Sequence, residues 1–390
     1  MWIERRIHSH IARLASTRPA TILTGARQTG KTSLLREQFP DYGFVTLDVP
    51  SEADQAQRDP DGFFLRHPAP VILDEVQHAP ELFRHLKVLI DKDRAVAGRF
   101  LLTGSQKFQL MQHASESLAG RLGLVELETL SRPEIRSVNP GITLEENILR
   151  GGYPELHANP QILTRDFYSA YLASYLERDV RSLLNVSSLR DFERLIRACA
   201  LRSGQLLNKS DLARDVGITP STANQWLSVL QASNIVILLE PWFSNQTKSL
   251  VKSPKLYIAD SGLLCHLAGI SSESSLLASP LWGSIWETFV FSELRKQQVN
   301  RGGFWSCHFW ADRSREVDFL IHHGGRFELY EAKTTARPDS GDTRTLHYLI
   351  EHLGEKNIIR AGVICRVGNP YPLGREITAW PIDDVPAAEM

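Results

Sequence analysis

The sequence predicts an α/β protein of several domains. Its 390 residues exceed the size at which a single hydrophobic core usually stops growing. Over residues 1–136, short apolar runs alternate with amphipathic stretches, which is typical of a parallel sheet covered by helices. Within this region, residues 25–32 read Gly-Ala-Arg-Gln-Thr-Gly-Lys-Thr, a glycine-rich turn between an apolar strand and a helix. The chain therefore begins with an α/β domain that has the pattern of a phosphate-binding turn.

This turn fits G-x-x-x-x-G-K-[ST], in which backbone N–H groups and the helix N-terminus face the phosphates of a nucleotide. Lys31 would reach the β- and γ-phosphates, and the Thr32 hydroxyl would bind Mg²⁺. A chance Lys-Thr after an ordinary turn is the alternative, but the strand before and the helix after favour the first interpretation. The residues expected to bind ATP are Gly25, Ala26, Arg27, Gln28, Thr29, Gly30, Lys31, Thr32 and Ser33.

A second apolar run, residues 70–75, ends in two carboxylates, and we expect it to form the parallel strand next to the first one. Asp74 would hold Mg²⁺ through water, and Glu75 would polarise the attacking water in hydrolysis. A core strand that ends in solvated acids is the alternative. Because the two motifs occur together and in order, they predict nucleotide binding.

Two further segments would complete the site. Residues 99–105 read as another buried strand, at whose carboxyl end Thr103 and Ser105 would contact the γ-phosphate or its water. Arg121 follows a helix-like stretch and would neutralise transition-state charge, either in its own subunit or in a neighbouring one. A surface salt bridge explains Arg121 equally well.

With these motifs, the chain resembles a large prokaryotic family of AAA-type ATPases that carry a C-terminal domain of unknown function. The matching segments run over nearly the whole chain: residues 25–32, 73–75, 102–105, 118–121, 151–155, 177–179, 255–263 and 316–319. The resemblance implies an ATP-hydrolysing first domain and leaves the purpose of the remainder undefined.

Glycine- and proline-containing breakers mark the end of the first domain, which we place at residue 136. Residues 137–188 follow as a helical connector, in which Arg178 and Asp179 would either reach the nucleotide or form an ordinary ion pair. Its aromatic residues have the spacing of a core stripe: Phe167, Tyr168, Tyr171 and Tyr175.

Residues 189–245 predict a winged helix-turn-helix. Thr219 is the expected N-cap of its second helix, and Pro220 is the expected first helical residue. The open face of this helix is polar and would hydrogen-bond DNA phosphates or base edges, although the helix has no Arg or Lys. The residues in question are Ser221, Thr222, Asn224, Gln225 and Ser228, followed by Lys248, Lys252 and Lys255, which would track a DNA backbone. A lid or a protein contact is an equally good explanation.

Residues 246–390 predict an α/β domain with a nuclease-like arrangement. A hairpin brings Asp318 on one strand toward Glu331 and Lys333 on the next, and Glu287 points inward from a preceding helix. Three carboxylates and a lysine match the PD-(D/E)XK nuclease in residue type and order. Glu287, Asp318 and Glu331 would hold a metal ion, and Lys333 would orient the water. A solvated ion pair between Glu331 and Lys333 is the alternative, and such domains also persist as binding platforms.

Composition narrows the range of partners. A net charge of -1 argues against binding nucleic acid through overall charge, while leaving room for a local basic groove. The four cysteines are far apart, which suits a reducing cytoplasm, and no apolar run approaches the roughly 20 residues of a membrane span. We therefore expect a cytoplasmic protein with ATP and Mg²⁺, with DNA, another protein or a second copy of itself as candidate partners.

The sequence thus predicts a Mg²⁺-dependent ATPase whose nucleotide state controls a DNA-handling, nuclease-like C-terminal half. The alternative is an ATP-gated signalling or scaffolding switch whose C-terminal half binds protein and is catalytically silent. The salt dependence of partner binding distinguishes the two hypotheses. Binding to DNA phosphates weakens steeply as the salt concentration rises, whereas an apolar protein contact does not weaken in this way.

Overall fold

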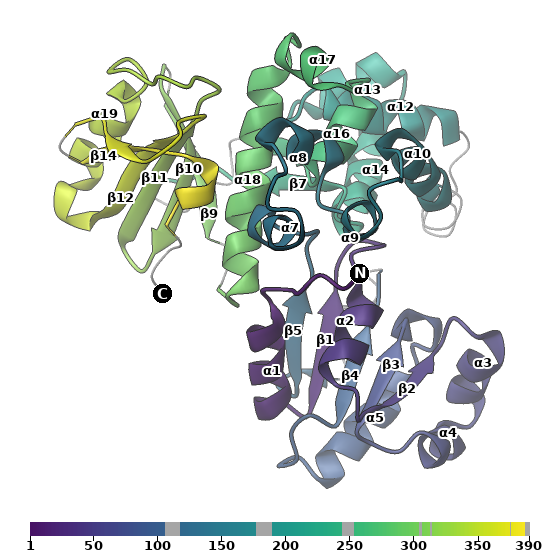
Figure 1. The fold of residues 1–390 in the computed structure, drawn as a ribbon. Helices are drawn as coiled ribbons and strands as arrows, with labels where there is room; N and C mark the ends of the chain where they lie inside the picture. The colour runs from purple at the N-terminus through teal and green to yellow at the C-terminus, as the bar shows by residue number, and fades with distance from the viewer. Residues whose placement is uncertain are drawn as a thin grey trace.

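The computed structural model describes residues 1–105, 118–176, 189–243, 253–303, 306–312, 314–374 and 376–386. Figure 1 shows an amino-terminal sheet at the bottom, a helical lobe above it and a second sheet beside that lobe. No helix in these ranges is both long enough and apolar enough to cross a membrane.

The amino-terminal sheet has five parallel strands, as the sequence predicted for an α/β domain. Their spatial order is β2 (Gly43–Thr46), β3 (Val71–Asp74), β4 (Phe100–Thr103), β1 (Ala20–Thr24) and β5 (Leu122–Glu126). One face packs on α1 (His8–Thr17) and α2 (Lys31–Gln38), and the other on α3 (Pro50–Arg58), α4 (Pro60–Arg66) and α5 (Leu82–Lys92), with η1 (Val76–His78) after β3.

The strand order corrects one expectation. β3 is not the neighbour of β1, because β4 lies between them and pairs with both. Apolar runs identify buried strands but not their order, which depends on hydrogen bonding between distant segments. Because β4 lies between β1 and β3, its carboxyl end lies between the glycine-rich turn after β1 and the acidic residues at the end of β3.

The helical lobe begins with α7 (Arg132–Val138), α8 (Leu144–Arg150), α9 (Pro154–Ala158) and α10 (Thr164–Tyr175). The predicted aromatic stripe is confirmed as core, since Phe167, Tyr168, Tyr171 and Tyr175 are all buried. Arg178 and Asp179 lie outside the described residues.

The lobe continues with α12 (Leu189–Ala200), β6 (Gln205–Leu206), α13 (Lys209–Val216), α14 (Pro220–Ala232), β7 (Val236–Leu239) and β8 (Lys255–Ile258). The three strands form an antiparallel sheet in the order β6-β8-β7. Thr219 caps α14 by accepting from the Thr222 N–H, as predicted. Lys255 starts β8 and is buried, so it does not extend a surface stripe of lysines, and Lys248 and Lys252 lie outside the described residues.

After α16 (Ser261–Leu267) and α17 (Glu273–Leu277), the long helix α18 (Trp282–Asn300) leads into the second sheet. Its spatial order is β13 (Tyr371–Pro372), β14 (Ile377–Trp380), β12 (Ile358–Ile364), β11 (Arg326–Ala332), β10 (Glu316–His323) and β9 (Cys307–Ala311). The predicted hairpin is the antiparallel pair β10–β11, whereas β11–β12 and β12–β14 are parallel. α19 (Arg344–Leu353) covers one face, η3 (Glu355–Asn357) precedes β12, and η4 (Ile382–Asp384) follows β14.

Helix α18 joins the three parts of the molecule (Figure 1). Trp286 and Phe291 bury their rings in the core that the helical lobe shares with the second sheet. Near the carboxyl end of α18, Val299 packs on a hydrophobic cluster of the amino-terminal domain. This cluster contains Ile7 and Ile11. The first sheet is therefore in direct contact with the helix that carries the C-terminal half.

Candidate active site

The glycine-rich turn lies between β1 and α2, and its two ends favour glycine. A Cβ on Gly25 would lie 2.2 Å from the Leu127 carbonyl oxygen, and Gly30 has φ +89° at the start of α2. The Lys31 ammonium donates to the carbonyls of Gly25 at 3.1 Å and Ala26 at 2.8 Å. The turn thus keeps a buried cation beside the N-terminus of a helix, the combination that binds phosphate.

Asp74 ends β3 and is surrounded by hydroxyls. Its Oδ1 accepts from Thr32 at 2.5 Å and from Thr103 at 2.6 Å, and its Oδ2 accepts from Thr46 at 3.0 Å. The Thr32 hydroxyl and the Asp74 carboxylate therefore lie together at the carboxyl edge of the sheet. Hard oxygen ligands of this kind suit Mg²⁺, so these two residues fit the ion that the sequence predicted. Thr46 was not predicted, although it ends β2 in the way that Thr103 ends β4.

Glu75 is held beside Asp74 in a left-handed backbone conformation, with φ 54°. Its N–H donates to Thr103 Oγ1 at 3.1 Å, and its carboxylate accepts from Ser105 Oγ at 3.4 Å and from the Gln77 amide. A non-glycine residue with this backbone is uncommon and persists only where its surroundings hold it. The structure therefore brings Glu75 and Ser105 together at the same edge as Thr32 and Asp74.

Arg121 does not join this group of side chains. In the pairing of β1 with β5, Ala20 lies opposite Leu122 and Thr24 lies opposite Glu126. Residue 121 therefore lies at the amino ends of the strands, whereas the glycine-rich turn lies at their carboxyl ends. Its guanidinium instead forms a two-pronged ion pair with Asp91, at 2.6 and 2.9 Å.

Arg5 was missed by the sequence analysis, although it contacts the turn directly. Its buried guanidinium donates to the Thr29 carbonyl at 2.9 Å, to the Glu128 carbonyl at 2.7 Å and to Glu134 Oε1 at 3.2 Å. Burial opposes the charge on Glu134, but Arg5 and hydrogen bonds from Ser131 and Arg6 outweigh it, so the pKa of this carboxyl lies below its ordinary value. No local pattern reveals such a residue, since its three acceptors are distant in sequence.

The end of β5 and the residues after it, Glu126 to Glu128, also contact the C-terminal half. On α18, the Arg295 guanidinium forms ion pairs with Glu128 at 2.6 Å and Glu126 at 3.2 Å. Glu126 also accepts from the Asn234 amide, in the turn between α14 and β7, at 2.6 Å. A continuous path of contacts therefore runs from Thr29 in the turn through Arg5 and Glu128 to Arg295.

The four residues predicted to form a nuclease-like site lie in two ion-paired groups: Glu287 and Asp318 are beside Lys255, and Glu331 is beside Lys333. The Lys255 ammonium lies 2.9 Å from Glu287, 3.4 Å from Asp318 and 2.5 Å from Glu316. Lys333 lies 3.1 Å from Glu331, on the strand paired with the one that carries Asp318. We call this group of six residues, from three elements and the end of β11, the Lys255 cluster.

The charges of the Lys255 cluster are strongly coupled. Burial and the nearby Asp318 carboxylate raise the pKa of both Glu287 and Glu331. Burial opposes the charge on Lys255, but Glu287, Asp318 and Glu316 outweigh it and raise the pKa of the ammonium. The Lys255 ammonium thus compensates the negative charge of Glu287, Asp318 and Glu316.

This arrangement does not fit the metal site predicted at Glu287, Asp318 and Glu331. Across the described residues, no three Asp, Glu, His or Cys side chains are arranged to hold a metal ion. Lys255 lies where it compensates Glu287 and Asp318, and a dication there would be repelled by the ammonium. Sequence reasoning assigned Lys255 to a DNA-binding surface and so missed its place among these acids.

The comparisons with known proteins identify an AAA domain in the amino-terminal part of the chain. Residues 17–136 match the family described as AAA domain, and residues 142–274 and 282–385 match two domains of unknown function, DUF8612 and DUF4143. An uncharacterized protein of Mycobacterium tuberculosis is 31% identical over 390 residues, which span 99% of this chain and 85% of that protein. The chain belongs to the same family. An uncharacterized protein of Mycobacterium bovis matches with the same values.

Among solved structures, the Walker-type ATPase PABY2304 of Pyrococcus abyssi is similar, with 18% identity and a TM-score of 0.46 over 67% of this chain and 94% of that one. AMPPCP-bound DnaA from Aquifex aeolicus has 13% identity and a TM-score of 0.32 over 58% and 85%. Similarities of this size do not assign a ligand or a partner.

The Lys255 cluster yields a first prediction. Lys255→Ala should lower the melting temperature, because removing one partner of a buried ion pair costs about 3–5 kcal/mol. It should also create affinity for Mn²⁺, since the remaining carboxylates then lack a cation. Calorimetric titration with Mn²⁺ and thermal melts with and without Mn²⁺ measure both effects.

The matched control is Lys255→Ala combined with Asp318→Asn, in which the new Mn²⁺ affinity should disappear. If wild-type protein binds Mn²⁺ as tightly as Lys255→Ala, and Asp318→Asn weakens that binding, then our account of the Lys255 cluster is wrong.

Proposed function

We propose that this protein is a Mg²⁺-dependent ATPase whose nucleotide state is transmitted to its C-terminal half. The observation that carries the proposal is the group of polar side chains at the mouth of the glycine-rich turn. Lys31 and Thr32 begin α2, Asp74 and Glu75 end and follow β3, and Ser105 follows β4; their contacts place them at the carboxyl ends of the strands. The match of residues 17–136 to an AAA domain supports the same activity.

Each residue has a role that follows from its position. Lys31 would exchange the Gly25 and Ala26 carbonyls for the β- and γ-phosphate oxygens of ATP. Thr32 and Asp74 would hold Mg²⁺, which neutralises phosphate charge when it is bound. Glu75, fixed by Ser105 and Gln77, would orient the attacking water and accept its proton.

The transmission follows the contacts that join the turn to α18. A phosphate bound at the turn acts on the loop whose Thr29 carbonyl Arg5 holds. Arg5 also holds Glu128, and Glu128 pairs with Arg295 on α18. Buried charge pairs of this kind have few alternative arrangements, so a shift of the loop is passed on rather than absorbed.

DNA is the partner that we propose for the C-terminal half. The supporting observation is α14, whose outer face is exposed and polar through Ser221, Asn224, Gln225 and Ser228. Helix, strand, two helices and two strands follow one another from α12 to β8, the order of a winged helix. The Lys255 cluster favours a binding role over cleavage, so we propose an ATP-gated switch that holds DNA without cutting it.

The hydrolytic site yields a second prediction. Glu75→Gln should lower turnover about 10²–10⁴-fold while ATP still binds, because an amide oxygen accepts a proton far less well than a carboxylate. Lys31→Ala should abolish binding, because it removes the cation that contacts the phosphates. Phosphate release and binding of a fluorescent ATP analogue measure the two effects.

The exposed Glu81→Gln, in the same domain, serves as the control and should match wild type in both assays. Wild-type turnover in Glu75→Gln would remove Glu75 from its role as base.

A third prediction concerns Arg121. Because it lies at the far edge of the sheet, we propose that it acts only on nucleotide bound by a neighbouring subunit. Turnover per molecule should then rise with protein concentration, and Arg121→Ala chains should depress mixtures with wild type beyond simple dilution.

Asp91→Ala frees the same guanidinium without removing it and should not depress such mixtures. If turnover per molecule is constant and mixtures behave as the average of their components, Arg121 is simply the partner of Asp91.

A fourth prediction concerns DNA. Double-stranded DNA should bind and change the rate of ATP hydrolysis, and its affinity should fall steeply between 50 and 200 mM salt, as expected for about six or more phosphate contacts. Asn224→Ala combined with Gln225→Ala should weaken binding about tenfold or more, because these side chains face outward on α14. Fluorescence anisotropy with labelled DNA measures the affinity.

Ser274→Ala, on the exposed surface of α17, is the control. Binding that ignores salt, or none at all with an intact ATPase, would replace DNA with a protein partner.

A further inference from the structure

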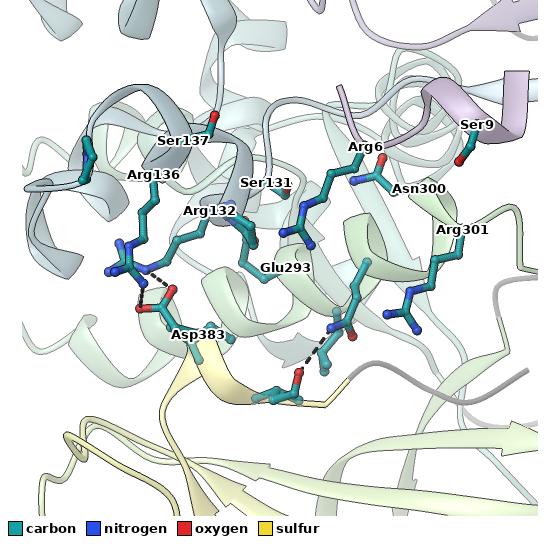
Figure 2. Close-up of a pocket in the computed structure, with 16 residues that line it drawn as sticks. Arg6, Ser9, Ser131, Arg132, Arg136, Ser137, Glu293, Asn300, Arg301 and Asp383 are labelled. Carbon is teal, nitrogen blue, oxygen red and sulfur yellow. Dashed lines mark hydrogen bonds and ion pairs between the residues drawn. The ribbon is translucent and has the colours of Figure 1, made fainter. Parts of the chain in front are cut away.

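A cavity of about 920 Å³ lies where four parts of the chain meet, away from the glycine-rich turn. Figure 2 shows that side chains from the segment before α1, from α7, from the end of α18 and from η4 point into it. Ligand sites commonly form at such junctions and occupy roughly 300–1,000 Å³. None of the proposed ATP-site residues lines this cavity, so it requires a separate explanation.

The wall of the cavity carries more positive than negative charge. Four arginines line it, Arg6, Arg132, Arg136 and Arg301, against two carboxylates, Glu293 and Asp383. Both carboxylates are already compensated. Asp383 pairs with Arg132 at 2.8 Å and with Arg136 at 3.1 Å, and Glu293 pairs with Lys296 at 3.1 Å.

Arg6 has the clearest capacity to bind a ligand. Its side chain is exposed and points into the cavity, and within the described residues its guanidinium has no ion-pair partner. Its backbone N–H is fixed by Glu134 at 2.7 Å, so the residue is anchored while its side chain faces the space. Arg301 projects into the same space from the carboxyl end of α18.

A second, independent observation indicates a polar ligand. Asn300 lines the cavity and is only 6% exposed, yet its side-chain Oδ1 has no hydrogen-bond partner within the described part of the chain. Buried amides are normally hydrogen-bonded, and an unsatisfied one costs about 1–3 kcal/mol. A ligand with hydroxyl or other donor groups besides its anionic groups would satisfy it.

The lining also defines the class of ligand. Guanidinium groups bind phosphate through two parallel hydrogen bonds, and several of them around one space favour a compact polyanion. No aromatic ring is present among the described residues that line the cavity, so nothing there would stack on a base. We propose that this cavity binds a small molecule that carries more than one phosphate group, held by Arg6 and Arg301 and oriented by Asn300.

The test uses the full chain with Lys31→Ala, so that the glycine-rich turn does not contribute to phosphate binding. Pyrophosphate is the probe, titrated by calorimetry at constant ionic strength. We expect binding that weakens about tenfold in Arg6→Gln and further in Arg6→Gln with Arg301→Gln, because each change removes charge-assisted hydrogen bonds. Arg13→Gln, an exposed arginine on α1 outside the cavity, should bind like the parent.

Two results would overturn the proposal. One is the absence of pyrophosphate binding in the Lys31→Ala chain, or equal binding in the Arg6→Gln and Arg301→Gln double variant, with folding of each protein verified by circular dichroism. The other is binding of a labelled single-stranded oligonucleotide that is lost in the double variant while pyrophosphate does not bind. That second pattern would assign the arginines to a nucleic-acid backbone instead.

Discussion

The buried guanidinium of Arg5 holds together three segments that are distant in the sequence. It satisfies two backbone carbonyls and one carboxylate that come from the glycine-rich turn, the segment after β5 and α7. Glu134 is 2% exposed, so without Arg5 it would be a buried charge with only hydrogen bonds to support it. Breaking such a pair costs about 3–5 kcal/mol, a large fraction of the stability of a domain. Arg5 therefore holds the turn against the start of the helical lobe.

The segment that Arg5 holds is also where the other parts of the chain attach. Arg295 of α18 reaches Glu126 and Glu128, and the Arg132 N–H donates to Glu293 of α18 at 2.8 Å. Asp260 accepts from the Gly152 N–H at 2.8 Å, which fastens α16 to the chain after α8. These contacts involve charged groups with little access to water, where each is stronger than at a surface. The glycine-rich turn and the C-terminal half thus share a boundary of direct contacts.

The arginine-lined cavity lies on the other side of the same boundary. Glu134 accepts from the Arg6 N–H and pairs with the Arg5 guanidinium, so adjacent residues face the cavity and the turn. If occupation of one site shifts this carboxylate, the affinity of the other must change by the same factor, since coupling between two binding sites is reciprocal.

The sequence predicted what depends on local pattern. The turn at residues 25–32, the strands around it and the hairpin of β10 and β11 are each encoded within a few neighbouring residues, and each was found. The order of β3 and β4, the three acceptors of Arg5 and the partner of Arg121 depend on residues tens of positions apart, which apolar periodicity does not report. Glu75 and Ser105 were predicted as site residues because both follow directly from buried strands.

The Lys255 cluster shows how far residue type and order can mislead. Glu287, Asp318, Glu331 and Lys333 were predicted to meet, and they do, but the prediction placed a metal ion among them. Lys255 comes from β8, which pairs with β6 and β7, whereas its partners come from α18 and β10. An ammonium in this position does what a structural cation would do, since it holds together carboxylates that would otherwise repel one another. It also joins the small sheet of β6, β7 and β8 to α18 and to the second sheet.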